Sequence, residues 1–368
     1  MRKLMIWLTV LALSCAMVAA HADENRLGLE ILARKYDGAN NQFVSPVSLN
    51  YALAMAASGA EGETLRELLN ACEINDPMDI ERWNAPLEAA GLKWANAAFV
   101  QDGTPLNQTY IDALKSAFGA ELLPLDDVQR VNAWVDAHTD HLIDRLLDDL
   151  DPDILLMLVN AIAMDAKWSH AFDPEATWGD TFHAPSGDVE AQFMHDTFFM
   201  GYGENDLAQF IRLDYRNSGL YMLIALPRED RLPDVLEAVA AEGVEWFSPL
   251  QSREVQLSLP KVDVQVSNTL SADLQALGIE RAFSMAAEFP GISPQALKIN
   301  DVIQKVRVQL DEEGTRAAAV TAVMMEAAGC VPFDDPPVEF NANRPFMVLI
   351  AEEETGAVCF AGAVCEPQ

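Results

Sequence analysis

Apolar and polar residues alternate along residues 302–310, VIQKVRVQL. A period of two is typical of a β-strand with one buried face, so this segment is predicted to be a half-buried strand. Residues 155–168 form a nearly continuous apolar run, which predicts a strand buried on both faces. Further strands are predicted over residues 92–100, 209–213, 219–226 and 255–259.

Helical spacing of apolar residues predicts helices over residues 23–36, 107–118, 128–147, 234–241 and 271–277. Ser45 or Ser48 can cap a further helix rich in Ala and Met, which should break near residues 59–62 before a second helix starts at Glu63. The sequence thus predicts both helices and strands.

The segment from Leu310 to Pro332 reads LDEEGTRAAAVTAVMMEAAGCVP. Most of its residues from Thr315 to Met324 are small or β-branched, and no charge follows Arg316 until Glu326. As a strand, it would place its one charge on a single face, so the other face could be buried inside an existing sheet. The same residues also have high helix propensity, and a surface helix closed by Gly329 is the alternative.

The charge balance restricts the partners of this chain. It has 24 basic and 57 acidic residues, a formal net charge of -33. Nucleic acids and heparin would be repelled by such a surface, so neither is expected as a partner. We interpret the acidic residues as a feature of solubility spread over the surface.

The first 22 residues have the pattern of a secretory signal peptide: Arg2 and Lys3, an apolar run, and a small-x-small site at Ala20-His21-Ala22. A short membrane anchor and a lipoprotein site at Cys15 are the alternatives. We expect a secreted protein, extracellular or periplasmic if bacterial, with residues 23–368 as one domain. No later run has membrane-spanning length, so no membrane association is expected.

Motifs of metal and catalytic sites are missing from the sequence. His138 and His141 lie three apart on a predicted helix, but they belong to no HExxH pattern and have no third ligand nearby. GxSxG and Walker-type loops are also missing, so we expect no metal, no cofactor and no catalytic residues. Cys72, Cys330, Cys359 and Cys365 do not suggest a disulfide framework, because the last two are too far apart on one strand to pair.

The hinge Glu312-Glu313-Gly314-Thr315, followed by Ala317-Ala318-Ala319, resembles the start of the reactive-centre loop of the serpin family. The segments FNANRPFMVLI at 340–350 and FAGAVCEP at 360–367 resemble the C-terminal signature and final strand of that family. The resemblance extends from about residue 24 to the C-terminus. It implies an α+β fold of the serpin type, in which mixed helices surround a large central sheet with two smaller sheets and an exposed loop at about 312–333.

The resemblance also implies roles for individual residues. Ser45, Ser48 and Asn160 would belong to the region that opens to admit the loop, and Trp168 would mark the top of the sheet. Lys261 would pair with Glu312, as an exposed pair worth about 0 to 1 kcal/mol. The family's histidine falls on Gln304, whose amide must supply the hydrogen bonds to the serine and asparagine partners without a pH dependence. From local residues alone, the serines are simple caps and Trp168 is a core aromatic.

The implied function is inhibition of a protease, with the chain acting as a monomeric suicide substrate. Fifteen residues counted from Gly314 place Ala328 before the cleaved bond and Gly329 after it. A small residue there suits an elastase-like or subtilisin-like serine protease. Met325 and Glu326 are alternative specificity residues, and a cysteine protease is a second target class. The alternatives are a non-inhibitory carrier, storage protein or chaperone of the same fold, and a hydrolase with Ser, His and Asp converging in space.

Overall fold

The computed structural model describes residues 24–315 and 336–367 of the chain. The predicted signal peptide, Ala317, Ala318, Ala319, the reactive bond Ala328-Gly329 and Cys330 lie outside the described residues. The choice between a strand and a helix for the Ala-rich segment therefore stays open. Within the described ranges, no helix combines the length and the apolar character needed to cross a membrane.

Nine strands form the largest sheet of the described residues, in the order β1-β16-β15-β9-β8-β7-β10-β14, with β6 paired to β7. Their bounds are β1 Gln42–Val44, β6 Thr177–Ala184, β7 Gly187–Glu204, β8 Ala208–Asp214, β9 Leu220–Pro227, β10 Gln251–Pro260, β14 Val338–Asn341, β15 Phe346–Glu352 and β16 Val358–Val364. The strands β9, β15 and β16 are buried at every position, so they form the centre of the apolar core.

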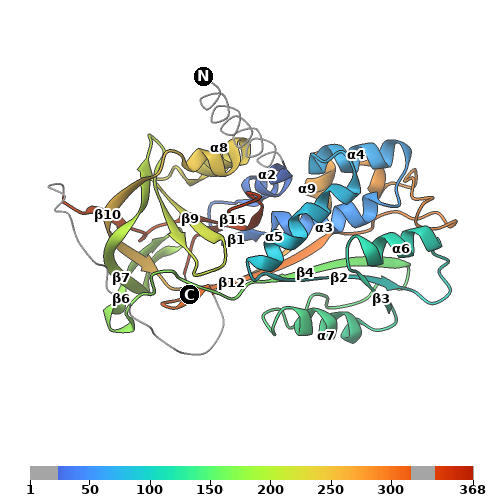
Figure 1. Ribbon diagram of the computed structural model, residues 1–368, viewed down its shortest axis with the longest axis horizontal. Coiled ribbons are helices and arrows are strands. Elements are labelled where there is room, and N and C mark those ends of the chain that lie inside the picture. Colours follow the sequence, from blue (N-terminus) through green and yellow to red (C-terminus); the bar gives the residue numbers. More distant parts are fainter. Residues whose placement is uncertain (1–23, 316–335, 368) are drawn as a thin grey trace, which may run out of the picture.

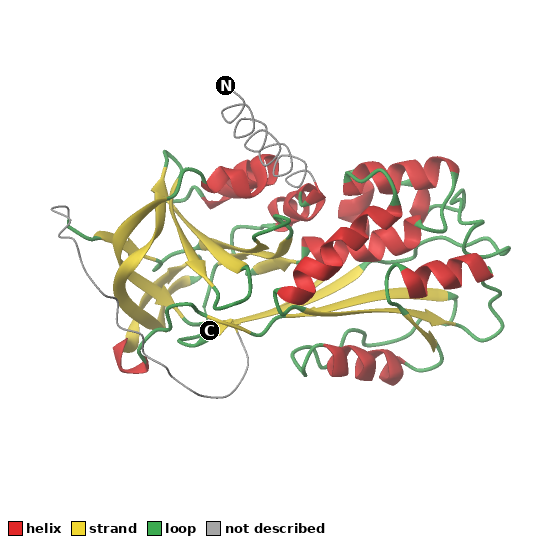
Figure 2. Ribbon diagram, viewed as in Figure 1, coloured by secondary structure: helices red, strands yellow, loops and turns green. Residues whose placement is uncertain are grey.

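Two smaller sheets lie beside each other in the other half of the molecule (Figure 1). One has the order β11-β12-β13-β5, and the other has the order β3-β2-β4. Their bounds are β2 Lys93–Val100, β3 Glu121–Pro124, β4 Leu156–Ala163, β5 Ala166–Lys167, β11 Val262–Thr269, β12 Ile303–Leu310 and β13 Gly314–Thr315. Helices cover one face of this layer, and α7 (Val128–His138) covers the other (Figure 2).

The helices follow the predicted segments in most places. Ser45 caps α3, because its side chain accepts a hydrogen bond from the Ser48 backbone N–H at 3.2 Å. The break near residues 59–62 separates α3 from α4 as expected. The bounds are α2 Arg26–Lys35, α3 Pro46–Ala57, α4 Gly62–Cys72, α5 Asn84–Ala89, α6 Gln108–Ser116, α8 Leu232–Glu242 and α9 Ser271–Ala276, with short 3-10 helices at Pro77–Trp83, Pro174–Ala176, Gly243–Phe247 and Arg281–Phe283.

The helix predicted over residues 128–147 is too long, because α7 ends at His138. Asp140 and His141 have positive φ angles, which a continuing helix does not allow. The Thr139 side chain accepts a hydrogen bond from the Ile143 backbone N–H, so it replaces the helical bond at this turn. His138 and His141 therefore do not share a helical face.

The strand predicted over residues 155–168 is also interrupted. β4 ends at Ala163, and β5 covers only Ala166 and Lys167. The two pieces belong to different sheets, since β4 pairs with β2 and β5 pairs with β13. The lower half of β4 is only partly buried, from Leu156 to Leu158, so the prediction of burial on both faces is wrong there.

Candidate functional site

The hinge residues Gly314 and Thr315 form a short strand, β13, inside the sheet. Thr315 pairs with Leu310 of β12 on one side and with Ala166 of β5 on the other, both antiparallel. Gly314 pairs with Lys167. Gly314 and Thr315, which belong to the loop expected to be exposed, are therefore buried, and the structure places them between two strands before any cleavage.

Glycine is required at position 314 by the closeness of β5. A Cβ atom built on Gly314 would lie 2.1 Å from the Ala166 carbonyl oxygen and 2.8 Å from the Lys167 Cα. Both of these are backbone atoms, which cannot rotate away as a side chain can. The glycine of the hinge thus allows β13 to approach β5 closely enough to pair.

Thr315 is the first side chain of the hinge that enters the core. It is 5% exposed, and its hydroxyl oxygen lies 2.6 Å from the phenol oxygen of Tyr215. The Tyr215 ring stacks on Trp168, with ring centroids 4.5 Å apart. Burial raises the pKa of Tyr215, so its phenol stays protonated and can donate to Thr315.

Trp168 holds the turn that precedes β13. Its indole N–H donates to the Asp311 carbonyl at 3.0 Å, and its backbone N–H donates to the Glu313 carbonyl at 2.9 Å. The Asp311 carboxylate accepts hydrogen bonds from the backbone N–H groups of Glu313 and Gly314. These contacts fix the direction in which the chain leaves β12.

Lys261 and Glu312 are in contact, as the resemblance implies. The Lys261 Nζ donates to Glu312 Oε2 at 2.7 Å, and the Glu312 side chain is only 14% exposed, so the pair is less exposed than expected. Burial acts to raise the pKa of Glu312. The hydrogen bonds that its carboxylate accepts from Lys261 and from the Glu312 backbone N–H act in the opposite direction, and their combined effect is larger. The pKa of Glu312 therefore lies below its ordinary value of 4.5.

A furrow separates β4 from β12 beyond the point where β13 ends. The two strands belong to different sheets, and no β-bridge joins them among the described residues. A cavity of about 70 Å³ lies in this furrow, with α3 and α7 on its two sides. Ser45, Ser48, Asn160 and Gln304 all line this cavity, so the structure brings the four expected residues of the opening region together.

The Gln304 amide bridges β12 and the start of α3. Its Oε1 accepts from the Ser45 backbone N–H, and its Nε2 donates to the Ser45 carbonyl, both at 2.9 Å. Asn160 makes no such contact with Gln304: its Nδ2 donates to Asn96 at 2.8 Å, and its buried Oδ1 has no partner among the described residues. Gln304 of β12 is thus bonded to Ser45, and Asn160 of β4 is bonded to Asn96. The expectation was that Gln304 would bond to both the serine and the asparagine.

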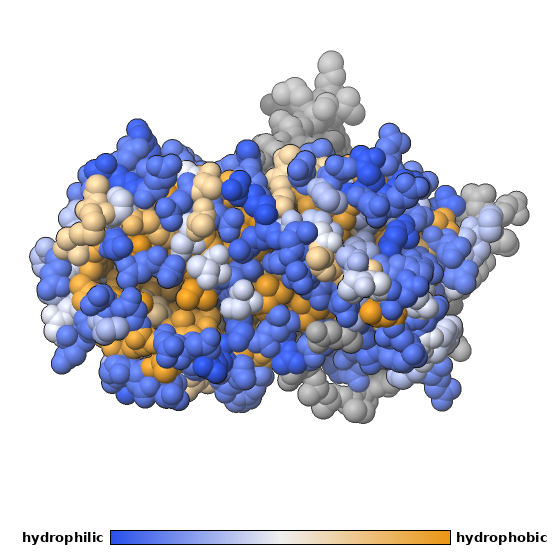
Figure 3. Space-filling model, turned by 180° about the vertical axis from the view of Figure 1, so that it is seen from behind, coloured by the Kyte–Doolittle hydropathy of each residue, from blue (hydrophilic) through white to orange (hydrophobic). Residues whose placement is uncertain are grey.

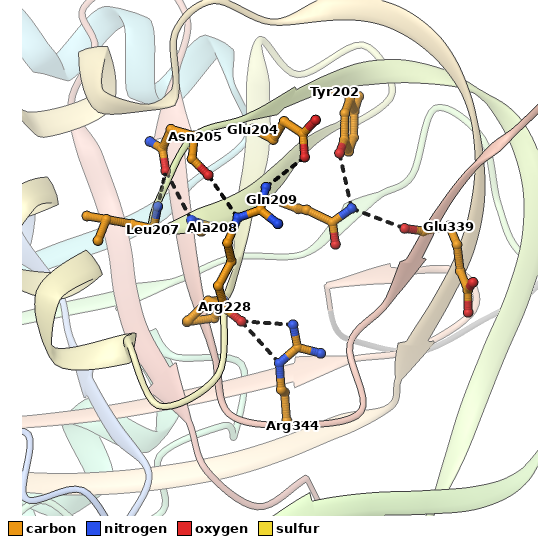
Figure 4. A network of polar contacts seen from close by, with 10 residues as sticks. Tyr202, Glu204, Asn205, Leu207, Ala208, Gln209, Arg228, Glu339 and Arg344 are labelled. Carbon is orange, nitrogen blue, oxygen red and sulfur yellow. Dashed lines mark hydrogen bonds and ion pairs between the residues drawn. The ribbon is translucent and has the colours of Figure 1, made fainter. Parts of the chain in front are cut away.

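The other end of the loop is anchored by a polar network around β14 (Figure 4). Gln209 Nε2 donates to the Glu339 carbonyl and to the Tyr202 hydroxyl. Arg344, in the predicted C-terminal signature, donates two hydrogen bonds to the Pro227 carbonyl at 3.0 and 2.8 Å. β14 is parallel to β10, so both ends of the loop are attached to sheets by backbone pairing.

His138 and His141 do not share a metal site in the part of the chain that the structure describes. His138 contacts Trp134 and Glu121, whereas His141 contacts Asp136. No cluster of three or more potential metal ligands occurs in residues 24–315 and 336–367. Cys72, Cys359 and Cys365 are free and buried, and burial raises the pKa of Cys72 to about 12.

Two residues of the site were not identified from the sequence. Tyr215 follows a predicted strand and Asn96 lies inside another, but neither belongs to a recognisable motif. Tyr215 reaches the hinge because β8 leads directly to the Trp168 bridge. Asn96 lies opposite Asn160 in the β2–β4 register, so correct strand pairing would have suggested this contact.

The protein-family model described as "Serpin (serine protease inhibitor)" matches residues 22–367. Among curated proteins, a serpin-like protein of Thermococcus kodakarensis is 33% identical over 349 residues, which cover 89% of this chain and 81% of that protein. Iripin-2 of Ixodes ricinus is 31% identical over 393 residues, which cover 99% of this chain and 98% of that protein.

Solved structures agree with the sequence comparisons. The thermophilic serpin tengpin in its native state has a TM-score of 0.82 at 26% identity, with 94% of each chain covered. Thyroxine-binding globulin in complex with thyroxine has a TM-score of 0.83 at 25% identity, with 96% of this chain and 100% of that chain covered. The fold, the hinge and the family match agree, and the chain belongs to the serpin family.

Proposed function

We propose that this chain is a secreted, monomeric inhibitor of serine proteases that acts as a suicide substrate. The observation that carries the proposal is the position of β13. The hinge already occupies the top of a strand position between β12 and β5, and below it β4 and β12 remain unpaired with each other. A cleaved loop would continue β13 into this furrow.

The register of β13 indicates how many loop residues could pair with β12 after insertion. Thr315 lies opposite Leu310 in an antiparallel pair, so each step forward along the loop is one step back along β12. Residue 322 would lie opposite Ile303, where β12 begins. The run from Thr315 to Ala322 therefore matches the whole of β12, and its uncharged face can be buried.

In the proposed mechanism, the catalytic serine of the target attacks the Ala328 carbonyl. An ester bond forms between that serine and Ala328, and the bond between Ala328 and Gly329 breaks, releasing the new amino group of Gly329. The freed end then inserts and carries the attached protease away from its starting position. Distortion of the protease would stop hydrolysis of the ester.

Ala328 supports an elastase-like or subtilisin-like target, because a small residue fits a shallow apolar specificity pocket. Met325 at the cleaved bond would still suit an elastase-like or a chymotrypsin-like protease, whereas Glu326 would suit a glutamate-specific protease. A cysteine protease is a further target class. The acidic surface, with a net charge of -33, argues against heparin or nucleic acid as a cofactor.

The test is to incubate residues 23–368 with pancreatic elastase and with subtilisin, separate the products on denaturing gels, and locate the cut by mass spectrometry. A complex that survives denaturation, with cleavage near Ala328, supports the proposal. A catalytically inactive protease, with its serine replaced by alanine, is the matched control and should form no such complex.

A carrier function is the second candidate, because thyroxine-binding globulin, which has a similar structure, is found in complex with thyroxine, a small molecule. Cleavage of the loop without a complex, and without a gain in thermal stability, would favour this candidate. The small hinge residue Thr315 supports inhibition instead, since a bulky or charged residue there would hinder insertion.

A further inference from the structure

A second and larger pocket lies at the end of β4 that begins with Leu156. Its volume is about 570 Å³, which falls within the range of small-molecule sites. Its walls come from α3, from residues 151–158 and from residues 284–302. It meets the smaller cavity of the furrow at four residues, Ala52, Met157, Asp301 and Val302.

Part of the pocket lining is apolar. Five consecutive apolar residues on one wall, Ile154 to Leu158, are all only partly buried. The opposite walls contain Leu53, Ala56, Phe289 and Ile292, which are each at most 5% exposed. Apolar surface that stays partly accessible, as on residues 154–158, is typical of a binding site. Figure 3 shows apolar side chains on the molecular surface at this end of the molecule, where α4 and α6 lie in Figure 1.

The charged residues around the pocket favour a ligand with a positive charge. Asp151, Asp153 and Asp301 line it together with one cation, Lys298. Asp151 accepts a hydrogen bond from the Asp153 backbone N–H, and Asp301 accepts one from the Ser271 hydroxyl. None of these three carboxylates forms an ion pair with a residue of the described chain. The negative potential of the whole acidic chain acts in the same direction.

We propose that this pocket binds a small organic cation with an apolar body, of the alkylammonium class. The apolar body contacts the wall from Ile154 to Leu158, and the cationic group lies among the three carboxylates at the mouth. An anion of the same shape would be repelled by these carboxylates and by the net charge of the chain.

A ligand here would also regulate the inhibitor, an extension that rests on the proposed function. In the register of β13, Val323 of an inserting loop would lie opposite Val302, a residue of the pocket wall. The bound cation occupies space that the end of the inserted strand must enter. It therefore slows the last part of insertion, so a larger fraction of the inhibitor is cleaved without trapping the protease.

The binding test uses isothermal calorimetry on residues 23–368 without any protease. The probes are decyltrimethylammonium and decanoate, which share an apolar chain and differ in charge, both below the concentrations at which they form micelles. We expect saturable binding of one decyltrimethylammonium, at least about tenfold tighter than decanoate. Equal affinity for the two probes, or binding of many cations without saturation, would overturn the assignment.

Two variants locate the site. Asp151→Asn combined with Asp153→Asn should weaken the cation at least about fivefold, whereas Asp188→Asn combined with Glu190→Gln, on the β6–β7 hairpin, should not change it. Ala296→Trp, at an exposed position of the pocket wall, should weaken both probes while the thermal midpoint stays unchanged. Unaltered cation affinity in Ala296→Trp would place the ligand elsewhere and overturn the proposal.

The regulatory part is tested by the yield of complex with elastase or subtilisin, with and without the cation. A lower yield in the unmodified chain, and no change in Ala296→Trp, supports regulation. An unchanged yield at saturating cation overturns regulation. A chain that forms no complex even without the cation contradicts the proposed function, while the calorimetry decides separately whether the pocket is a cation site.

Discussion

The hydroxyl of Thr315 lies 2.6 Å from the phenol oxygen of Tyr215, and both side chains are buried. This contact joins the hinge to the bridge between Trp168 and Tyr215. It places the Thr315 side chain in the position from which an inserted strand must begin. Loop insertion can then proceed from a paired end, without first opening the top of the sheet.

Thr315→Arg should convert the chain from an inhibitor into a substrate. The site that Thr315 occupies is 5% exposed, and burial of an unpaired guanidinium there would cost several kcal/mol. We expect the number of inhibitor molecules consumed for each complex formed to rise by about tenfold or more, as measured on denaturing gels. Thr315→Ser, which keeps the hydroxyl, is the control. Full inhibition by Thr315→Arg would mean that this position need not be buried.

Gly314→Ala should release β13 from β5. The added methyl group would meet the Ala166 carbonyl oxygen, and overpacking of this kind costs about 1 to 3 kcal/mol. Urea unfolding should show this loss of stability, or the pairing should be lost and the amides of Gly314 and Thr315 should exchange faster. Gly179→Ala in β6 is the control, since only the movable side chains of Glu190 and Gln192 lie near it. Equal stability and equal exchange in both variants would contradict the close packing.

Much of the fold could be predicted from the sequence, because the spacing of apolar residues follows the pattern of buried positions in each helix and strand. The alternation over residues 302–310 matches β12, and the strands predicted at 209–213, 219–226 and 255–259 fall on β8, β9 and β10 of the largest sheet. The long strand β7 and its partner β6 received no prediction. Their exposed and buried positions do not alternate regularly, since β7 passes from the β6 hairpin to the pairing with β10.

The site was predicted in part. Lys261 and Glu312 could be paired, and Gln304 could be assigned to the opening region, because each belongs to a motif of the family. The insertion of β13 could not be predicted, since it depends on the distance between the Gly314 backbone and β5. The end of α7 depends similarly on positive φ angles at Asp140 and His141, which neither residue type requires.

The ion pair of Lys261 and Glu312 should make the free energy of unfolding depend on pH in the acidic range. The folded-state pKa of Glu312 lies below 4.5, so its stabilising contribution is present above that value and is lost as the pH falls through the folded pKa. Lys261 is 37% exposed, so solvent screening limits the contribution to about 0 to 1 kcal/mol. The measurement is the free energy of unfolding of the chain and of Glu312→Gln between pH 3 and pH 7. A difference that stays constant over this range would contradict the ion pair.

Gln304→His should introduce a pH dependence that the natural chain lacks. Gln304 both accepts from and donates to the Ser45 backbone, and a neutral imidazole can do the same. A protonated imidazole cannot accept a hydrogen bond from the Ser45 N–H. This loss and the burial of position 304 would both lower the pKa of the introduced histidine in the folded state. The variant should therefore lose stability relative to the natural chain as the pH falls below about 6.5, in addition to any change that the natural histidines such as His195 cause in both chains. Parallel pH profiles of the two chains in thermal unfolding would contradict this account of Gln304.

The central claim is that the cleaved loop fills the furrow between β4 and β12, and amide hydrogen exchange tests it most directly. Exchange of residues 156–163 and 303–310 would be compared before and after cleavage of the loop, with β2 as the internal reference, since it is already paired with β3 and β4. The account predicts that cleavage slows exchange of the furrow-facing amides of β4 and β12 and leaves β2 unchanged. Unchanged exchange in both strands after complete cleavage would show that the loop does not enter the furrow, and would contradict the proposed mechanism.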